Sequence, residues 1–358
     1  AVHRDHRTFS SQVGGTELEE LEKDPEAREA RRTMLETDPP EHTRIRKLVS
    51  RSFTRRAIAH WESTAKTLVA ESIDQALLDH QTDFVETVAR RFPIQMISRL
   101  LGVPDRDAEQ LFHWADAVVY HADPDYSELL YDKDDTDPYR LLPFRSPASA
   151  KVFEFAKRLA SEKAKHPEAD VVSILAASED LTEQEFQTFF LLLVIAGNET
   201  TRHSLSHGAL ALAEFPDQLD RLRGDPSLIS TATEEILRWA SPQIHFRRTA
   251  VCETELAGVP IAVGDKVVTW YISANYDERA FVDPYTLDLG RNPNPHVTFG
   301  GGGPHFCLGA WMARLEVRVF LEEVMTRVGR IHLNGEPQRI RSNFINGLKH
   351  LPLTLEQV

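Results

Sequence analysis

The sequence predicts a mainly α-helical protein with smaller β-sheets, an α+β fold, on three observations. Helical patterns, with loops marked by proline and aspartate, fill the first two-thirds of the chain. One apolar helical pattern in the middle is unusually long. Segments rich in β-branched and aromatic residues come later, at Val251–Ile261 and Lys266–Ile272, with glycines at their turns. Helices followed by separate strands are typical of this fold class.

The long helix is expected to begin at Thr182, where T-E-Q-E can form a capping box between the Thr182 hydroxyl and Glu185. No proline follows until Pro216, so the helix should span ~33 residues, roughly 50 Å. Its middle is apolar on all sides, which predicts a helix that crosses the core. The polar residues Asn198–Thr201 interrupt this apolar stretch.

The segments before this helix are more polar. Glu17–Arg32 is highly charged and is expected to form a surface helix or a mobile loop. A helix should open directly after Pro39-Pro40. The acidic, proline-broken stretch Tyr131–Pro147 is expected to be a flexible connection between two helices.

Two elements are expected near the C-terminus. An amphipathic helix should follow Cys307, and Asn343–Leu355 is typical of a short hairpin. No linker divides the chain, so residues 1–358 are predicted to form a single domain. Because the first residues resemble the middle of a fold, we expect this domain to be incomplete at its N-terminus.

Composition excludes several classes of function. The net charge of −14 over 358 residues argues against nucleic-acid binding, which needs cations to neutralise phosphates, and against docking on anionic lipid. The longest apolar run, Phe189–Gly197, is about half of a membrane span. We expect no signal peptide, and the only cysteines of this sequence, Cys252 and Cys307, provide no disulfide framework. We therefore expect a cytoplasmic protein.

Cys307 stands after four consecutive glycines and just before the expected helix. A helix N-terminus stabilises a thiolate, and glycines let backbone N–H groups approach the sulfur closely. A lone cysteine is more often a small core residue, and we assign that structural role to Cys252. The segment FGGGGPHFCLG favours a ligand role for Cys307.

This segment resembles the haem-binding loop of the cytochrome P450 family, whose signature is matched by Phe299, Gly303, His305, Cys307 and Gly309. The resemblance covers nearly the whole chain. It implies the cytochrome P450 fold, with haem b between the long central helix and the cysteine loop and its helix, and with the Cys307 thiolate as iron ligand. Thiolate ligation favours O–O cleavage. The loop is one residue longer than the commonest form and is similar to bacterial members acting on methyl-branched lipids, steroids and terpenoids.

The segment AGNETT, at Ala196–Thr201, resembles the oxygen-activation segment of the family. The resemblance implies that Ala196 contacts the haem and that Glu199 and Thr200 are catalytic. An acid and a hydroxyl buried together could relay protons, with water as the carrier. Gly197 would let the helix open beside the haem. The alternative is a threonine bonded to its own helix and an exposed glutamate.

Glu235 and Arg238 match the E-x-x-R pair of the family. Their spacing places both on one helix face, where most such pairs are surface ion pairs of little energetic weight. The resemblance implies a buried structural pair that supports the cysteine loop. Glu234 is the alternative acid, four residues from Arg238.

Four residues correspond to the family's contacts with the haem propionates: His42, Arg46, Arg248 and His305. Two carboxylates that enter a protein interior must meet donors. Arg247 competes with Arg248. Arg248 is preferred because the family's arginine precedes a small-residue pair, here Thr249-Ala250.

Between His42 and Arg56 there are six basic residues and no acid, a local reversal in an acidic chain. Those not assigned to the haem are Arg44, Lys47, Arg51, Arg55 and Arg56. They form either a solvated helix face or a docking patch for an acidic electron donor. Bacterial relatives receive electrons from a ferredoxin and its ferredoxin reductase, which favours docking, and such docking should be salt-sensitive.

The resemblance places the substrate pocket among five segments, of which Tyr120–Arg145 is a lid. The other four are Phe9–Leu35, Leu192–Thr200, Gln243–Phe246 and Asn343–Gly347. Their apolar residues and few fixed charges favour an apolar substrate with one or two polar handles. The side chains expected to line the pocket are Ile195, Gln243, Ile244, His245, Phe246 and Phe344. Gln243 and His245 could hydrogen-bond a handle, although ordinary packing is the commoner role.

The sequence therefore predicts a monomeric monooxygenase that uses O2 and two electrons from a redox partner. Its substrate would be an apolar terpenoid, steroid or branched fatty acid. A haem-thiolate peroxygenase using H2O2 is the alternative, disfavoured because Glu199 and Thr200 provide the relay that reductive oxygen activation requires. A non-catalytic haem-binding sensor is more remote, since a sensor needs neither this relay nor a lid.

Overall fold

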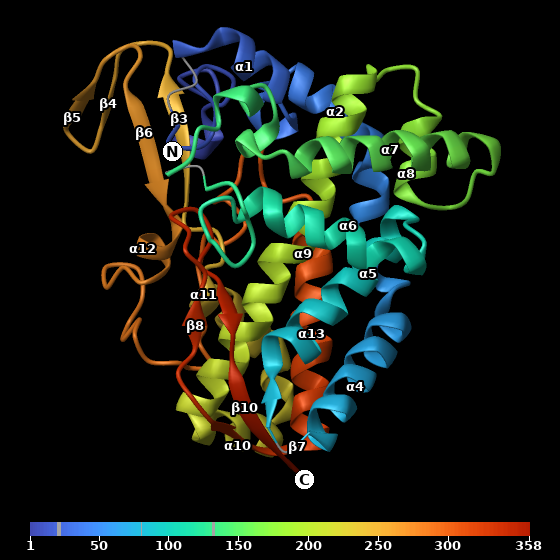
Figure 1. The fold of residues 1–358 in the computed structure, drawn as a ribbon. Helices are drawn as coiled ribbons and strands as arrows, with labels where there is room; N and C mark the ends of the chain where they lie inside the picture. The colour runs from blue at the N-terminus through green and yellow to red at the C-terminus, as the bar shows by residue number, and fades with distance from the viewer. Residues whose placement is uncertain (20–22, 80, 131–132) are drawn as a thin grey trace.

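The computed structural model describes residues 1–19, 23–79, 81–130 and 133–358 (Figure 1). Its α-helices are α1 Pro25–Arg31, α2 Glu41–Val49, α3 Arg55–Ala59, α4 Glu62–Leu78, α5 Arg91–Leu101, α6 Asp105–Val119, α7 Ala148–Lys165, α8 Val171–Ala176, α9 Glu183–Glu214, α10 Pro216–Gly224, α11 Ile229–Ala240, α12 Tyr271–Asn275 and α13 Ala310–Arg327. Short helical turns are η1 Val2–Arg4, η3 Met34–Glu36, η4 Ser50–Phe53, η5 Val85–Arg90, η6 Asp137–Tyr139, η7 Pro143–Arg145 and η8 Pro226–Leu228.

The strands are short and antiparallel. They are β1 Phe9–Ser10, β2 Thr82–Asp83, β3 His245–Ala250, β4 Thr254–Leu256, β5 Val259–Ile261, β6 Lys266–Trp270, β7 Val328–Leu333, β8 Gln338–Arg339, β9 Leu348–His350 and β10 Pro352–Gln357. Across the described residues they pair in the orders β1-β3-β6, β2-β10-β7, β4-β5 and β8-β9. The helices lie together, with the β3–β6 sheet and the β4–β5 hairpin to one side (Figure 1), which confirms the predicted α+β class.

Helix α9 is the centre of the fold. It contains 32 residues, and the capping box of Thr182 and Glu185 is formed at its start. It packs against α5, α6, α7, α11 and α13, so most of its length is buried. The predicted core-crossing helix is therefore confirmed (Figure 1).

Other expected elements are found where the sequence placed them. Helix α2 begins at Glu41, directly after Pro39-Pro40, and α13 begins three residues after Cys307. The stretch 131–147 connects α6 to α7, although Tyr131 and Asp132 lie outside the described residues. Within Glu17–Arg32 the end is helical, as α1; residues 20–22 are likewise outside the description.

The expected C-terminal hairpin is wrong. β9 and β10 are separated by one residue, Leu351, and do not pair with each other. β9 pairs with β8, while β10 pairs with β7 on one side and β2 on the other. A single residue is too short to form a hairpin turn, so the chain continues into a second sheet instead.

None of the described helices has both the length and the apolar character needed to cross a membrane.

Candidate active site

An internal cavity of about 290 Å³ separates the middle of α9 from the glycine-rich loop that carries Cys307. Ala196 is exposed in the middle of the otherwise buried α9 because it faces this cavity. Phe299, Cys307 and Gly309 line the opposite wall. The cavity is therefore bounded by the two segments whose sequences carry the cysteine and acid–hydroxyl motifs.

The loop before Cys307 is fixed by its backbone. The Cys307 N–H donates to the Phe299 carbonyl at 3.0 Å, which closes the loop. Gly303 has a φ of 86°, and a Cβ there would lie 2.0 Å from the carbonyl oxygen of His3. Only glycine fits this position, so the loop packs closely on the N-terminal segment.

The Cys307 side chain is exposed to the cavity. Burial raises the pKa of its thiol, while the Gly309 N–H, Arg46 and Arg314 lower it to a smaller extent. The expected stabilisation of the thiolate is therefore present but is outweighed by burial. A metal ion on the sulfur would displace the proton outright. Cys252 is exposed rather than buried, so its expected role as a core residue is wrong.

Cationic and imidazole groups gather on one side of the cavity without anionic partners. Burial lowers the pKa of both Arg46 and Arg248, and neither has an ion-pair partner among the described residues. Both ring nitrogens of His42 are buried and unpartnered, and its ring centroid lies 4.2 Å from that of His305. Such a donor set needs an anionic ligand.

These residues fit haem. Two propionates would meet the unpaired donors, and Cys307 offers a thiolate to the iron. A Cβ on Gly309 would meet nothing within 4 Å, so this wall leaves room for a flat group. Arg247, the competing arginine, does not line the cavity; it donates to backbone carbonyls, at 3.0 Å in the case of Glu19.

The histidine of the loop is neutral. Burial, together with Arg248 and His42, lowers the pKa of His305 to about 2. Its Nε2 lies 3.1 Å from Ser11 Oγ. A propionate beside His305 would act in the opposite direction and raise this pKa, since an adjacent negative charge favours the imidazolium.

Two residues beside Arg248 were missed by sequence reasoning. His3 and Tyr271 both line the cavity, and the Tyr271 hydroxyl lies 3.0 Å from His3 Nε2. Burial lowers the pKa of His3 to about 4. His3 belongs to no motif, and Tyr271 follows a strand, so no sequence signal was available.

Thr200 and Glu199 both border the cavity. The Thr200 hydroxyl donates to the Ala196 carbonyl at 3.0 Å, as in the structural alternative for this threonine. Glu199 is fully buried, contrary to that alternative. Burial, reinforced by Asp116, raises the pKa of Glu199 well above its usual value, whereas Arg202 opposes this.

The expected opening of α9 at Gly197 is wrong. The helix is continuous through this residue. A Cβ at Gly197 would lie 2.5 Å from Ile97 Cδ1 of α5. This glycine therefore allows α5 and α9 to pack closely.

Glu199 belongs to a buried polar network that the sequence did not reveal. Tyr120 donates to Glu199 Oε2, and Asn198 donates to Oε1 at 2.7 Å. Tyr120 also lies 2.7 Å from His203 Nε2. Arg202 lies 3.8 Å from Glu199 Oε2. These partners come from α6 and α9, far apart in sequence.

Glu235 and Arg238 form a fully buried, bidentate ion pair with both N···O distances at 2.8 Å. Arg238 also donates to the carbonyl of Asn275 at 2.8 Å. Asn275 in turn bonds to Val297 N at 2.8 Å and Thr298 Oγ1 at 2.9 Å. The pair is thus connected to the residues that lead directly into the glycine-rich loop.

Glu234 has different partners. Its carboxylate accepts from Arg314 Nε at 2.6 Å and lies 2.9 Å from His296 Nε2. These contacts outweigh the opposing effect of burial and lower the pKa of Glu234 to about 2. Glu234 therefore ties α11 to α13, leaving Glu235 as the partner of Arg238.

Of the side chains expected in the substrate pocket, Ile195, Gln243, Phe246 and Phe344 line the cavity, but Ile244 and His245 do not. Side chains alternate along a strand, so His245 and Phe246 point to opposite faces of β3. The His245 ring packs on Trp270, with centroids 5.0 Å apart. The Gln243 amide donates to the carbonyls of His245 and Phe344, at 3.0 and 3.2 Å, so it is already engaged.

The cavity also has a charged end that composition did not predict. Residues 16–36 contribute Glu17, Glu19, Arg28, Arg31 and Glu36 to its lining. Burial raises the pKa of Glu17 to about 8. Arg31 donates to Glu19 at 2.6 Å. The expectation of few fixed charges is therefore wrong at this end.

The basic residues of α2, η4 and α3 differ in their surroundings. Lys47, Arg51, Arg55 and Arg56 are exposed, whereas Arg44 forms an ion pair with Glu185 of α9. The Arg55 guanidinium lies 5.4 Å from the ring centroid of Trp311, at the start of α13. The exposed basic residues thus lie on the same side of the molecule as Cys307.

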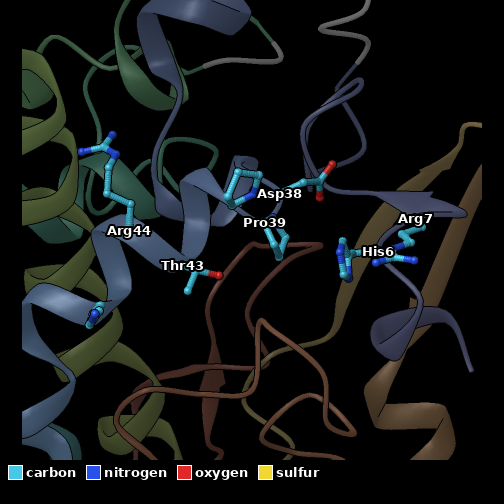
Figure 2. A pocket seen from close by; sticks show the side chains of 8 residues that line it. His6, Arg7, Asp38, Pro39, Thr43 and Arg44 are labelled. Atoms are coloured by element: carbon cyan, nitrogen blue, oxygen red, sulfur yellow. The ribbon is translucent and has the colours of Figure 1, made fainter.

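A second, shallower pocket of about 680 Å³ lies beside the start of α2. It is lined by His6, Arg7, Asp38, Pro39, Pro40, Thr43, Arg44 and Lys47. Figure 2 shows the Arg44 side chain turned away from His6 and Arg7, in agreement with its ion pair elsewhere. This pocket is separate from the residues that face Cys307.

Comparisons with known proteins agree with this geometry. The family model "Cytochrome P450" matches residues 227–338. The chain is 40% identical to a methyl-branched lipid omega-hydroxylase of Mycobacterium tuberculosis over 338 residues, 92% of this chain and 76% of the relative. It is also 40% identical to a steroid C26-monooxygenase of the same organism over 324 residues, 88% of this chain and 70% of the relative.

Solved structures show the same similarity. A cytochrome P450 of Mycobacterium marinum in complex with pseudoionone superposes with a TM-score of 0.89 and 39% identity, covering 99% of this chain and 84% of that one. A Bacillus megaterium protein solved in complex with testosterone superposes with a TM-score of 0.83 and 30% identity, covering 99% of this chain and 89% of that one.

Proposed function

The chain belongs to the cytochrome P450 family and is a haem-thiolate monooxygenase that acts on apolar molecules. On this basis we propose a substrate class for it and a role for each residue of the site. The supporting observation is that Cys307 faces Ala196 and Thr200 across one cavity. Haem bound by Cys307 would supply activation of dioxygen with two electrons and insertion of one oxygen atom into a C–H bond.

The residues of this chain have five roles in the proposal. Cys307 holds the iron, and His42, Arg46, Arg248 and His305 hold the propionates. Phe299 and Gly309 border the haem on the cysteine side. Glu199 and Thr200 deliver protons on the α9 side of the cavity. For this, the Thr200 hydroxyl would break its hydrogen bond to the Ala196 carbonyl and turn toward the cavity. Glu235 and Arg238 keep the cysteine loop in place.

The proposed substrate is an elongated apolar molecule with one polar end. Leu192, Ile195, Phe246 and Phe344 provide the apolar part of the lining, whereas residues 16–36 provide the charged end. Methyl-branched lipids, steroids and terpenoids have this shape and polarity. A methyl-branched fatty acid is favoured, because Arg28 lies at the charged end and its guanidinium complements a carboxylate. Arg31 is already paired with Glu19.

A titration of the haem spectrum tests this substrate. A methyl-branched fatty acid, its methyl ester, a steroid and an acyclic terpenoid would each be added to the resting holoenzyme, and displacement of iron-bound water would be read from the spectral shift. The acid should bind more tightly than its ester. Equal affinities would contradict recognition of a carboxylate, and a shift with the steroid alone would assign a polycyclic substrate.

The electron donor is a redox partner, and we propose that it is a ferredoxin that binds beside Cys307. Lys47, Arg51, Arg55 and Arg56 are exposed there, next to the exposed rings of Phe306 and Trp311. An acidic protein surface complements such a patch. The Arg7-lined pocket in Figure 2 extends the basic surface toward the N-terminal segment.

Charge reversal tests this docking site. Lys47→Glu and Arg51→Glu should raise the KM for ferredoxin several-fold, most strongly at low salt, without changing the haem spectrum. The matched control is Arg330→Glu in β7, at the other end of the molecule (Figure 1). Equal effects of all three substitutions would reject the site. Turnover with H2O2 but not with reduced ferredoxin would instead favour a peroxygenase.

A further inference from the structure

Tyr120 stands where three parts of the molecule meet. It caps the C-terminal end of α6 and is the first residue of the 120–147 connection. Its side chain is 1% exposed. Its hydroxyl contacts Glu199 and His203 of α9, while its ring lies 4.8 Å, centroid to centroid, from that of Tyr126 in the connection.

The hydrogen bonds at Tyr120 have a defined direction. His203 Nδ1 accepts from the Leu348 N–H at 3.4 Å, and burial lowers the pKa of His203 well below its usual value. The neutral ring therefore carries its proton on Nε2 and donates it to the Tyr120 oxygen. The single phenolic proton of Tyr120 is then left for Glu199 Oε2.

Both oxygens of the Glu199 carboxyl are thereby held. Asn198 donates to Oε1 and Tyr120 to Oε2. The charged groups around this carboxyl are Arg202 on α9, Asp116 on α6 and Arg90 on η5. Asp116 joins the two arginines, since its carboxylate lies 3.3 Å from Arg202 and 3.6 Å from Arg90. Tyr120 is the neutral donor that reaches the carboxyl from outside α9.

The neighbours of Tyr120 include the cavity wall. Tyr120 clusters with Val119, Ile340 and Ile345, against which Ile195 and Phe344 pack. Of these, Val119, Ile195, Phe344 and Ile345 line the cavity. A molecule in the cavity would therefore contact the residues that hold the tyrosine ring.

We propose that Tyr120 is a positioning residue for Glu199, so that the packing of the lid (its described residues 120–130 and 133–145) and of the substrate sets the orientation of the relay acid. The inference rests on the proposed function, since Glu199 is the acid of the proposed relay. With the cavity filled, the ring is clamped and the Glu199 carboxyl is held for proton delivery. With the lid displaced, the Tyr120 hydroxyl moves away from Glu199 and the Glu199 carboxyl is free to turn. Proton delivery then fails, and less product is formed per electron.

Infrared spectroscopy of the holoenzyme tests the contact without turnover. The Glu199 carboxyl band is identified as the one missing from Glu199→Gln. In Tyr120→Phe, which keeps the ring and removes only the hydroxyl, this band should shift to higher frequency because its carbonyl loses a donor. The matched control is Tyr276→Phe, which removes a hydroxyl bonded to the Trp239 carbonyl and should leave the band in place. An unshifted band in Tyr120→Phe overturns the proposal.

Product formed per electron separates this inference from the proposed function. With the tightest-binding compound of the four named above, Tyr120→Phe should give several-fold less product per electron, with the affinity for the compound nearly unchanged. Tyr276→Phe should match the parent. If Glu199→Gln itself leaves product per electron unchanged, the proposed relay is wrong. If Glu199→Gln lowers the product formed per electron and Tyr120→Phe does not, the proposed relay is supported and the positioning role of Tyr120 is rejected.

Discussion

The wall of the cavity that carries Cys307 is supported by a fully buried ion pair, whereas the described parts of residues 16–36 and 120–147, on the opposite wall, are joined by an ion pair nearer the surface. Glu235 and Arg238 are both 0% exposed, while the lid pair of Arg140 and Asp24 is 32% exposed on each side. Surface pairs are weak and exchange easily, and a buried pair costs much more to break.

This difference matches what each wall must do. The cysteine side has to keep one sulfur at a fixed position relative to α9, and movement there would lose the haem. The substrate side has to open and close around a ligand, which requires contacts that break at low cost. The contrast predicts that substitutions on the first side abolish haem binding, and that those on the second alter substrate exchange.

The largest effect is expected from Cys307→Ala. Removing the sulfur leaves no thiolate for the iron, so the reduced protein with carbon monoxide should lose the absorption band typical of thiolate ligation, and turnover should fall by more than ~10³-fold. Cys252→Ala, which removes an exposed thiol, is the matched control and should keep the band. A thiolate-type band in Cys307→Ala would disprove the ligand assignment.

The next largest effect is expected from Arg238→Ala. It removes the bidentate partner of Glu235, which then keeps Arg291 at 3.1 Å as its cation. It also takes the donor from the buried carbonyls of Asn275 and Pro284, so the expected cost is about 3 kcal/mol in the free energy of unfolding. Denaturant unfolding and haem content should both report the loss. Arg279→Ala removes an exposed pair with Asp277 and should change neither measurement. Equal stability of the two variants would mean that the buried pair does not support the loop.

Thr200→Ala should act on chemistry alone. Haem content and the carbon monoxide band should be unchanged, but product per electron should fall roughly tenfold or more, with the balance appearing as hydrogen peroxide. Thr200→Ser keeps the hydroxyl and should retain most of the coupling. Intact coupling in the alanine variant would leave Thr200 with only its bond to the Ala196 carbonyl.

The same contrast explains which parts of the site could be predicted from the sequence. The cysteine loop was predictable because its special residues are contiguous: Gly303 needs a backbone that only glycine tolerates, and Cys307 follows within the same turn. Helix α9 was predictable because its capping box and apolar pattern are local.

The opposite wall was not predictable, because its contacts join distant residues. Tyr120 and Glu199 are 79 positions apart, and nothing near Tyr120 in sequence marks it as a partner of an acid. His245 was misplaced because a change of one residue in strand register reverses the face of a side chain. The charged lining of residues 16–36 was missed because a charged segment normally faces solvent.

The smallest effect is expected where the lid meets β9. Lys349 lies 3.2 Å from Asp123, which is 0% exposed, and also contacts Asp125; Asp123 further accepts from the Arg341 N–H at 2.7 Å. Lys349→Met should therefore loosen the start of the 120–147 connection while the backbone contact persists. Stopped-flow mixing should show faster ligand release and a KM raised about two- to fivefold, on the order of 1 kcal/mol, with an unchanged haem spectrum.

The matched control for the lid is Lys66→Met. Lys66 also bridges two acids, Glu62 and Glu322, each at 3.1 Å, but on α4 and α13. Because Lys66, Glu62 and Glu322 do not line the cavity, ligand release should keep its parent rate. If both lysine variants release ligand equally fast, the ion pairs at the lid do not control access, and the functional contrast between the two walls would rest on the buried Glu235–Arg238 pair alone.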